Sequence, residues 1–434
     1  MRRPSPRIPA ISKCLSRLAL AAALAIAPTS ALPADDWPQW LGPDRDAVSD
    51  ETGLLDSWPD GGPPVVWRRP LGQGFSSVSV LGDRLFTLEG EGVTRDGLVE
   101  DQSHEYVVAI SALDGKTIWR TRIDESFADA RGSGPRSTPT LDGDRLFVLS
   151  SQGQLTALAL DDGRLLWQRD LVGEFGGELP LWGYSASPLV VGERVLIAGG
   201  GEDHAILAFH RSDGRLLWHV GSSPPSYSSP VIGTLAGVRQ AVFLQGDRIV
   251  AVTPEGEELW SHPWEVINRI NVATPRLLPG DRVFVSTSYD VGAVVLEVAR
   301  SGDGGLEVRE LWRNREMKNH FNGSVLAEGK LYGFDNATLE CLDPETGEAC
   351  WAHRGLGKGS LLLADGKLIV LAERGRLALA AIDPAEYREI SGFQLVRART
   401  WTPPTLAHGR LYVRTEEELM QLDLRADRGE GDSR

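Results

Sequence analysis

The chain has 434 residues, of which 41% are hydrophobic and 24% are charged, a composition typical of a soluble globular protein. Its formal net charge is −15, and an acidic surface repels nucleic acid and anionic lipid. We therefore expect no nucleic-acid partner. No apolar run is long enough to cross a bilayer, so we expect no membrane span. We also expect a monomer.

The first 34 residues have the layout of a secretory signal peptide. Five basic residues and no acidic ones lie here, and a ten-residue apolar run, Leu18–Ala27, precedes small residues. Ala31 and Ala34 both suit cleavage, and the sequence does not choose between them. Cys14 precedes the apolar run, whereas a lipid-anchoring cysteine would follow it. We therefore expect a protein that is periplasmic or secreted, with a net charge of −20 after cleavage at Ala34.

Residues 35–64 are expected to form an N-terminal extension packed on the main domain. The stretch Asp35–Gly62 is polar, rich in proline and glycine, and carries three tryptophans. This composition predicts an extended segment lying on a domain surface, not a domain of its own.

A β-hairpin pattern recurs through the rest of the chain. In Gln154–Trp167 an alternating apolar run meets a turn at Gly163, and a second run leaves the turn and ends on tryptophan. Each copy follows another pair of short apolar strands joined by a tight turn, so one unit contains four strands. A glycine stands four residues before the tryptophan in five copies: Gly115–Trp119, Gly163–Trp167, Gly214–Trp218, Gly256–Trp260 and Gly347–Trp351.

The tryptophans that end the fourth strands recur every 39 to 52 residues, a period typical of β-propeller blades. We therefore predict an all-β fold, an eight-bladed β-propeller over residues 65–425 with four-stranded antiparallel blades, followed by a disordered tail at 426–434. The eighth fourth strand is degenerate and lies near Phe393. The seven tryptophans are Trp67, Trp119, Trp167, Trp218, Trp260, Trp312 and Trp351.

The two ends of this repeat region complement each other. It starts on a lone fourth strand, Val65–Arg69, and ends on a lone third strand, Glu418–Leu424. The N-terminal strand would complete the blade that the C-terminal strands leave unfinished. Such pairing closes the ring and removes the open sheet edge that a terminal blade would otherwise present.

The hairpin Cys341–Trp351, CLDPETGEACW, resembles the tryptophan-docking motif of pyrroloquinoline-quinone (PQQ) repeats. Asp36–Pro43 and Trp182–Pro188 look like the corresponding stretches of secreted bacterial PQQ-like propellers. Two groups share such repeats: quinoprotein dehydrogenases, and cofactor-free propellers similar to the assembly factor BamB. The resemblance implies that each repeat tryptophan packs on the backbone of the next blade.

The residues needed for quinone chemistry are not evident. The chain lacks adjacent cysteines, no calcium-binding set can be placed by motif, and the eight histidines lack metal-ligand spacing. We therefore expect no cofactor and no metal, and a non-catalytic binding or scaffold protein similar to BamB. Its partner would be an unknown protein or a small polar or anionic ligand. The alternative is a PQQ-dependent dehydrogenase that uses Ca²⁺ and oxidises an alcohol or a sugar.

Two cysteines remain after the leader, Cys341 and Cys350, and they face each other if the intervening turn spans Pro344–Gly347. They either form a cross-strand disulfide or fill core positions, as alanine, leucine and isoleucine do in the sister hairpins.

Polar and aromatic residues stand just before each first strand. Equivalent positions of propeller blades converge on one end of the central channel, so these side chains would line one concave pocket. The alternative is that they satisfy one another and channel water. The candidates are Arg131, Arg136, Trp182, Tyr184, Tyr227, Arg269, Asn271, His320, Asn322, Lys358 and Trp401.

Overall fold

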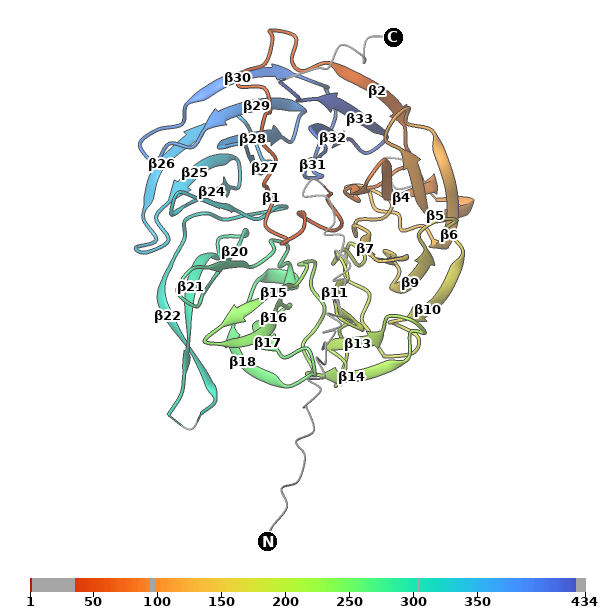
Figure 1. The fold of residues 1–434 in the computed structure, drawn as a ribbon, viewed down its shortest axis with the longest axis vertical. Helices are drawn as coiled ribbons and strands as arrows, with labels where there is room; N and C mark the ends of the chain where they lie inside the picture. Colours follow the sequence, from red (N-terminus) through yellow and green to blue (C-terminus); the bar gives the residue numbers. More distant parts are fainter. Residues whose placement is uncertain (2–35, 94–98, 303, 427–434) are drawn as a thin grey trace. The chain divides into compact units, whose positions relative to one another are not determined.

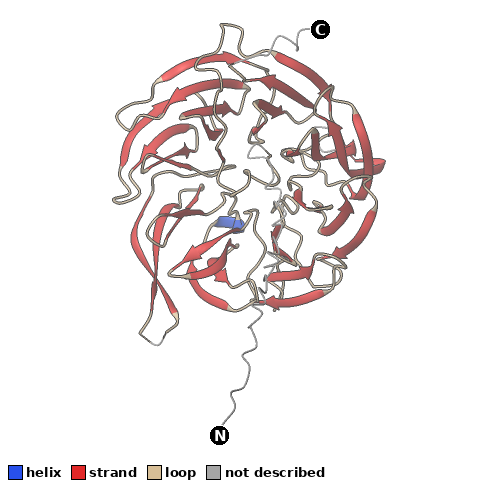
Figure 2. Ribbon diagram, viewed as in Figure 1, coloured by secondary structure: helices blue, strands red, loops and turns tan. Residues whose placement is uncertain are grey.

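The structure, a computed structural model, describes Met1 and residues 36–93, 99–302 and 304–426. Eight antiparallel sheets stand side by side in a ring, which confirms the eight-bladed β-propeller (Figure 1). The single helical element in these ranges is one 3-10 turn, η1 (Ile267–Arg269) (Figure 2). None of the helical structure described there is long and apolar enough to cross a bilayer. All of the expected signal peptide except Met1, and all of the expected tail except Ala426, lie outside the described residues.

Each blade contains four antiparallel strands, which are given below from the innermost to the outermost. Blades 1 to 4 consist of β3 (Ser79–Leu81), β4 (Arg84–Val93), β5 (Val99–Ser111) and β6 (Thr117–Glu125); β7 (Thr140–Asp142), β8 (Arg145–Leu149), β9 (Gln154–Ala159) and β10 (Leu165–Asp170); β11 (Leu189–Val191), β12 (Arg194–Ala198), β13 (Ile206–His210) and β14 (Leu216–Val220); β15 (Val231–Leu235), β16 (Val238–Leu244), β17 (Arg248–Val252) and β18 (Glu258–Pro263).

Blades 5 to 8 follow the same plan. They consist of β19 (Arg276–Leu278), β20 (Arg282–Thr287), β21 (Gly292–Arg300) and β22 (Leu306–Asn314); β23 (Val325–Ala327), β24 (Lys330–Asp335), β25 (Thr338–Leu342) and β26 (Ala349–Arg354); β27 (Gly359–Ala364), β28 (Lys367–Ala372), β29 (Arg376–Ala381) and β30 (Glu389–Gln394); β31 (Thr405–Ala407), β32 (Arg410–Arg414), β33 (Glu418–Asp423) and β2 (Val65–Pro70).

Strand β2 closes the ring as expected. It pairs antiparallel with β33, with Trp67 opposite Gln421 and Arg69 opposite Leu419. The eighth sheet therefore contains strands from both ends of the chain, and Figure 1 shows β2 beside β33.

The repeat tryptophans join neighbouring blades. In six of the seven, the indole Nε1 donates a hydrogen bond of 2.8 to 3.2 Å to a carbonyl of the next blade. Five of these rings also lie against the turn glycine of that blade: a Cβ at Gly163, for example, would lie 2.4 Å from the Trp119 ring. Trp260 differs, because its Nε1 donates to Gln240 of its own blade at 2.6 Å.

A β-bulge precedes the tryptophan in seven of the eight outer strands, and it shifts the backbone register of the two cysteines. Cys341 pairs with Trp351 and Leu342 with Ala349, so Cys350 is the extra residue of the bulge and is not a backbone partner of Cys341. The two thiols nevertheless contact each other, as expected. Both are free thiols, Cys341 buried and Cys350 exposed. Sister bulges hold Leu166 and Ile118 at the position of Cys350. Whether the pair oxidises remains a prediction.

The surface location expected for the N-terminal segment holds for residues 50–61, most of which are exposed, but not for residues 36–49. Trp37 is 3% exposed and pairs through its backbone with Val80 of the innermost strand of blade 1. Further on, β1 (Val48–Ser49) adds a parallel fifth strand to the inner edge of blade 7. Figure 1 shows this red segment crossing the centre of the ring.

Arg45 anchors this segment at the ring axis. Its guanidinium donates to the carbonyls of Pro230 at 2.9 Å, Ser187 at 3.3 Å and Pro188, residues that precede the first strands of blades 3 and 4. Burial lowers the pKa of Arg45 to about 9, so the side chain stays charged at neutral pH. These contacts hold the extension in the channel, because a buried cation is costly without hydrogen-bond partners.

Candidate ligand-binding site

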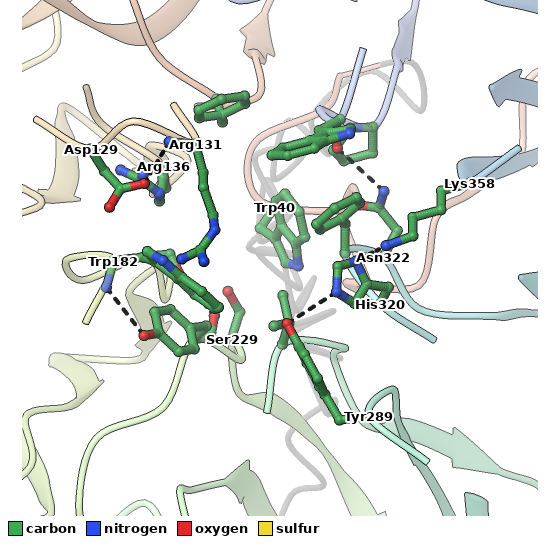
Figure 3. Close-up of a pocket in the computed structure, with 17 residues that line it drawn as sticks. Trp40, Asp129, Arg131, Arg136, Trp182, Ser229, Tyr289, His320, Asn322 and Lys358 are labelled. Atoms are coloured by element: carbon green, nitrogen blue, oxygen red, sulfur yellow. Dashed lines mark hydrogen bonds between the residues drawn. The ribbon is translucent and has the colours of Figure 1, made fainter. Parts of the chain in front are cut away.

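A pocket of about 410 Å³ opens at one end of the ring axis (Figure 3). Each of the eight loops that lead into a first strand contributes a side chain to it. In chain order these include Phe75, Arg131, Trp182, Tyr227, Val272, His320, Lys358 and Trp401. The pocket therefore lies where the propeller geometry brings equivalent positions together.

Eight of the eleven sequence-predicted side chains line this pocket. They are Arg131, Arg136, Trp182, Tyr227, His320, Asn322, Lys358 and Trp401.

The other three predicted residues are not part of the lining. Tyr184 is 1% exposed in the core between blades 2 and 3, and its hydroxyl donates to the carbonyl of Gly199 at 2.7 Å. Asn271 is fully buried and donates to the carbonyl of Gln245 at 2.7 Å. Arg269 is exposed in η1 and pairs with Glu178 at 2.8 Å. These residues stand one to three positions from the lining residue of their own loop, and their side chains do not enter the pocket.

Sequence reasoning missed several lining residues. Trp40 comes from the N-terminal segment, where its indole Nε1 donates to Thr274 Oγ1 at 2.9 Å, and it closes the pocket on the axis side (Figure 3). Tyr289 lies in the β20–β21 turn at a φ of 59°, a conformation that a β-branched or bulky residue rarely adopts. Neither occupies the repeat position used for the prediction. The remaining lining residues are Phe75, Asp129, Ser185, Ser229, Val272, Phe321 and Pro403.

Aromatic rings form two facing walls. On one side the Phe321 and Phe75 rings lie 4.4 and 5.6 Å from that of Trp401, with interplanar angles of 30° and 26°. On the other side Trp182 packs against Tyr227 at 5.6 Å. These walls provide flat apolar faces for a ligand.

Cations outnumber acids among the lining residues, which hold three cationic side chains and one carboxylate, Asp129. Arg136 is committed to the protein, because its guanidinium donates to the carbonyls of Gly132 at 2.6 Å and Gly134 at 2.7 Å. Arg131 differs: its guanidinium lies 5.5 Å from the Trp182 ring and has no ion-pair partner in the described part of the chain. Figure 3 shows it extending into the pocket.

Lys358, His320 and Tyr289 form a hydrogen-bonded chain along the opposite side. Lys358 Nζ lies 3.0 Å from His320 Nδ1, and His320 Nε2 lies 3.1 Å from the Tyr289 hydroxyl. Burial and the neighbouring Lys358 lower the pKa of His320 to about 4, so the ring is neutral at pH 7. Because the ammonium can only donate, Nδ1 accepts, Nε2–H donates, and the Tyr289 proton remains available to a ligand.

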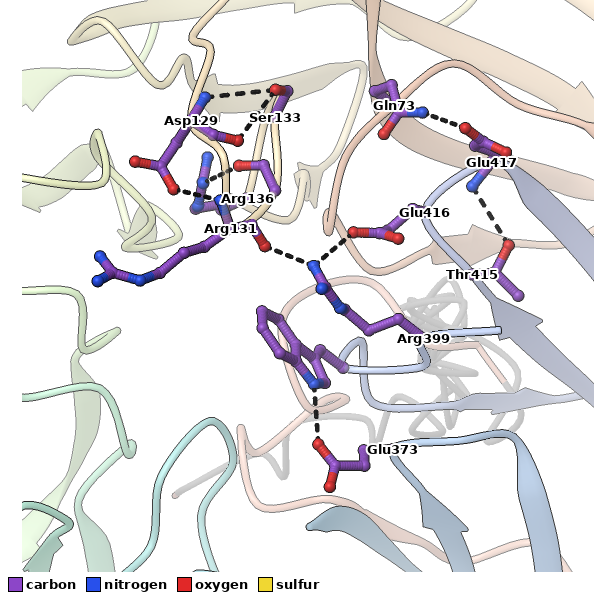
Figure 4. Close-up of polar contacts among 12 residues, drawn as sticks. Gln73, Asp129, Arg131, Ser133, Arg136, Glu373, Arg399, Thr415, Glu416 and Glu417 are labelled. Carbon is purple, nitrogen blue, oxygen red and sulfur yellow. Dashed lines mark hydrogen bonds and ion pairs between the residues drawn. The ribbon is translucent and has the colours of Figure 1, made fainter. Parts of the chain in front are cut away.

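A second layer of polar contacts holds the pocket loops together across the ring closure (Figure 4). Arg399 donates to the carbonyl of Arg131 and pairs with Glu416 at 2.8 Å. It thereby connects the loop before blade 2 to blade 8. The Trp401 indole donates to Glu373 at 3.3 Å, which fixes the ring that forms the aromatic wall.

Calcium does not suit this pocket. The ion takes about six to eight oxygen ligands. Asp129 is the single lining carboxylate, one of its oxygens already accepts the Arg131 backbone N–H at 2.7 Å, and three cationic side chains share the site. The donor set therefore does not fit the metal half of a PQQ–calcium centre.

One group of carboxylates elsewhere has its potential ligand atoms within 4.8 Å of one another: Glu316, Asp335 and Glu340. Lys318 Nζ contacts Asp335 at 2.9 Å, which already supplies a cation. Burial raises the pKa of Glu340 to about 7. We assign no metal to this group.

Fold and repeats define an eight-bladed propeller built from PQQ-type units. The sequence profile described as outer membrane protein assembly factor BamB matches residues 103–353, more than half of the chain. The chain belongs to this family, and the resemblance stated from the docking motif is confirmed.

The relatives are distant. The chain is 26% identical to BamB of Yersinia pestis over 347 residues, which is 75% of this chain and 80% of that protein. It is also 26% identical to BamB of Moranella endobia over 255 residues, which is 56% of this chain and 63% of the relative's length.

Two solved structures share the fold. BamB from Moraxella catarrhalis superimposes with a TM-score of 0.60 at 15% identity, covering 83% of this chain and 99% of that one. Quinohemoprotein alcohol dehydrogenase ADHIIG from Pseudomonas putida HK5 gives 0.57 at 12% identity, covering 91% and 81%. At these identities the likeness concerns the fold alone.

Proposed function

We propose that this protein is an exported, non-catalytic binding or scaffold propeller that holds a ligand or a segment of a partner at the mouth of its channel. The observation that carries the proposal is the convergence of all eight inter-blade loops on one pocket of about 410 Å³. Membership of the BamB family favours this reading over a dehydrogenase. The relatives are described as assembly factors, so a protein partner outside the cytoplasm is part of the proposal.

A thermal-shift screen of the full-length mature protein tests the binding role. Small polar molecules, anions and short peptides are screened against the wild type, Arg136→Ala and His320→Ala. We expect at least one compound to raise the unfolding temperature of the wild type but not of the variants. Arg309→Ala is the matched control, because that arginine is exposed and pairs only with Glu297 on the outer strands. If no compound distinguishes the pocket variants from the control, the proposal is wrong.

A second assay addresses the dehydrogenase alternative. The purified protein is incubated with PQQ and Ca²⁺, and dye reduction is followed with alcohols and aldoses. We expect no turnover, because Asp129 alone cannot supply the carboxylates of a calcium site. Substrate-dependent reduction that requires both additions would overturn the non-catalytic assignment.

The place of action is tested by cell fractionation together with N-terminal sequencing of the mature chain. We expect the protein outside the cytoplasm, beginning after Ala31 or after Ala34. An intact N-terminus in the cytoplasmic fraction would contradict export.

A further inference from the structure

The charge of the pocket contrasts with the charge of the protein. The chain as a whole carries −15, whereas the lining residues include Arg131, Arg136 and Lys358 against Asp129 alone. A cationic hollow in an acidic protein concentrates the electrostatic attraction for an anion at this one place. Arg131 extends into the hollow with its donors uncommitted, so it is the group placed to receive the negative charge (Figure 3).

The walls favour a ligand with a flat ring. Phe75, Trp401 and Phe321 present one nearly continuous apolar face, and Trp182 with Tyr227 presents the other. Both aromatic rings and the C–H face of a sugar ring pack well against such walls.

Polar groups between the walls favour a sugar ring over an aromatic hydrocarbon ring. Tyr289 and Tyr227 each have a hydroxyl proton without a described acceptor, since His320 and the Trp182 backbone N–H donate to their oxygens. A hydrocarbon ring would leave these groups unpaired at a cost in affinity, whereas hydroxyl groups both donate and accept.

We propose that the pocket binds an acidic saccharide, with the carboxylate against Arg131 and the ring between the two aromatic walls. The inference rests on the proposed binding function and specifies its ligand class. Lys358 and His320 then act as positioning residues, because they orient the Tyr289 hydroxyl as a donor to a ring or ring-substituent oxygen.

Isothermal titration of the full-length mature protein tests this class. The probes are a disaccharide that ends in glucuronate, its neutral counterpart that ends in glucose, naphthoate, and a short peptide with a C-terminal phenylalanine. We expect the acidic disaccharide to bind at least ~10-fold more tightly than the neutral one, because a charge-assisted hydrogen bond to Arg131 is lost in the latter. Raising the ionic strength should reduce this preference.

Variants of Arg131 test whether this residue causes the preference for the acidic disaccharide. Arg131→Ala should bind both disaccharides alike, Arg131→Lys should keep part of the preference, and the distant control Arg309→Ala should behave as wild type. Equal wild-type affinity for the acidic and neutral disaccharides, or an unchanged preference in Arg131→Ala, would overturn the proposal.

The remaining outcomes separate this inference from the wider function. If naphthoate or the peptide binds in a His320-dependent manner and the acidic disaccharide does not, the ligand class is wrong but a binding propeller remains supported. If no probe binds and the thermal-shift screen also finds no pocket-dependent ligand, both proposals fail.

Discussion

Arg45 shows how a single residue holds the axis of the ring. It is 3% exposed, and its guanidinium meets backbone carbonyls that lie at the inner ends of two blades. Leu41, Arg45 and Ala47 around it have φ values of 56° to 58°, a left-handed conformation that costs a non-glycine residue about 1 kcal/mol or more. The segment keeps this backbone because the buried contacts of Arg45 offset the strain.

Replacing Arg45 should therefore destabilise the protein strongly. In Arg45→Met the carbonyls of Ser187 and Pro230 lose this donor, and each such loss costs about 1–3 kcal/mol. We expect a decrease in the free energy of unfolding of about 3 kcal/mol or more by denaturant titration. The exposed Arg215→Met serves as control and should change stability by less than about 0.5 kcal/mol. Equal effects of the two substitutions would contradict the anchoring role.

His320 gives a pH-dependent prediction. Its pKa falls from about 6.5 to about 4 in the folded protein because of burial and of Lys358, while the unfolded chain keeps the ordinary value. Between pH 6.5 and 4 the unfolded state therefore binds the proton more readily, so this residue reduces stability as the pH falls through that range. The wild type should lose stability more steeply than His320→Gln over this interval. Parallel pH profiles of unfolding temperature would show that His320 contributes nothing.

At the scale of elements, the outer hairpins of neighbouring blades pack through a tryptophan ring of one blade and a turn glycine of the next. The turn glycine of one blade provides both a left-handed φ and room for the tryptophan of the preceding blade, as Gly163 does for Trp119. Burying a large aromatic side chain at each junction contributes to the cohesion of neighbouring sheets. This explains why glycine and tryptophan recur together at a fixed spacing in the sequence.

Two glycines separate the conformational effect from the packing effect. Gly163 has a φ of 69° and Gly366 a φ of 66°, but a Cβ at Gly163 would lie 2.4 Å from the Trp119 ring while none of the described atoms lies within 4 Å of one at Gly366. Gly366→Ala should cost about 1 kcal/mol, from backbone strain alone. Gly163→Ala should cost about 3 kcal/mol, because overpacking adds to that strain. Similar losses in chemical denaturation would mean that the tryptophan contact contributes little.

The repeated hairpins were predictable because period-two patterning and glycine turns are local signals. The direction of individual loop side chains was not: Tyr184 stands two residues from Trp182, yet it points into the core between blades. Trp40 and Tyr289 lie outside the repeat position that guided the prediction. Trp40 is held by a hydrogen bond to Thr274, a contact between residues far apart in sequence that no local pattern predicts.

At the scale of the whole molecule, ring closure depends on both ends of the chain. The backbone pairing of β2 with β33 was readable from the sequence, because a lone fourth strand at one end matched three strands at the other. The passage of residues 36–49 through the ring centre was not, since a polar stretch rich in proline and glycine carries no periodic pattern.

Two truncations of the mature protein separate these contributions. A chain beginning at Pro63 keeps β2 but loses the axial segment, and a chain beginning at Leu71 loses both. We expect the unfolding temperature to fall in the first and to fall further in the second, which exposes the edge of β33 and loses the Trp67 contact with blade 1. A chain beginning at Leu71 that unfolds like the full mature protein would refute closure by β2.

Trp40 also limits the routes by which a ligand can reach the pocket. Trp40 lines the pocket, and Leu41 and Arg45, which follow it in the chain, are buried, so a ligand that moved along the axis from the pocket would meet this segment. This arrangement favours insertion of the terminal unit of a long polymer over passage of the polymer along the axis. Binding at this site should accordingly favour chain ends over internal units, and cutting one long chain into many short ones should increase the number of chain ends available to bind.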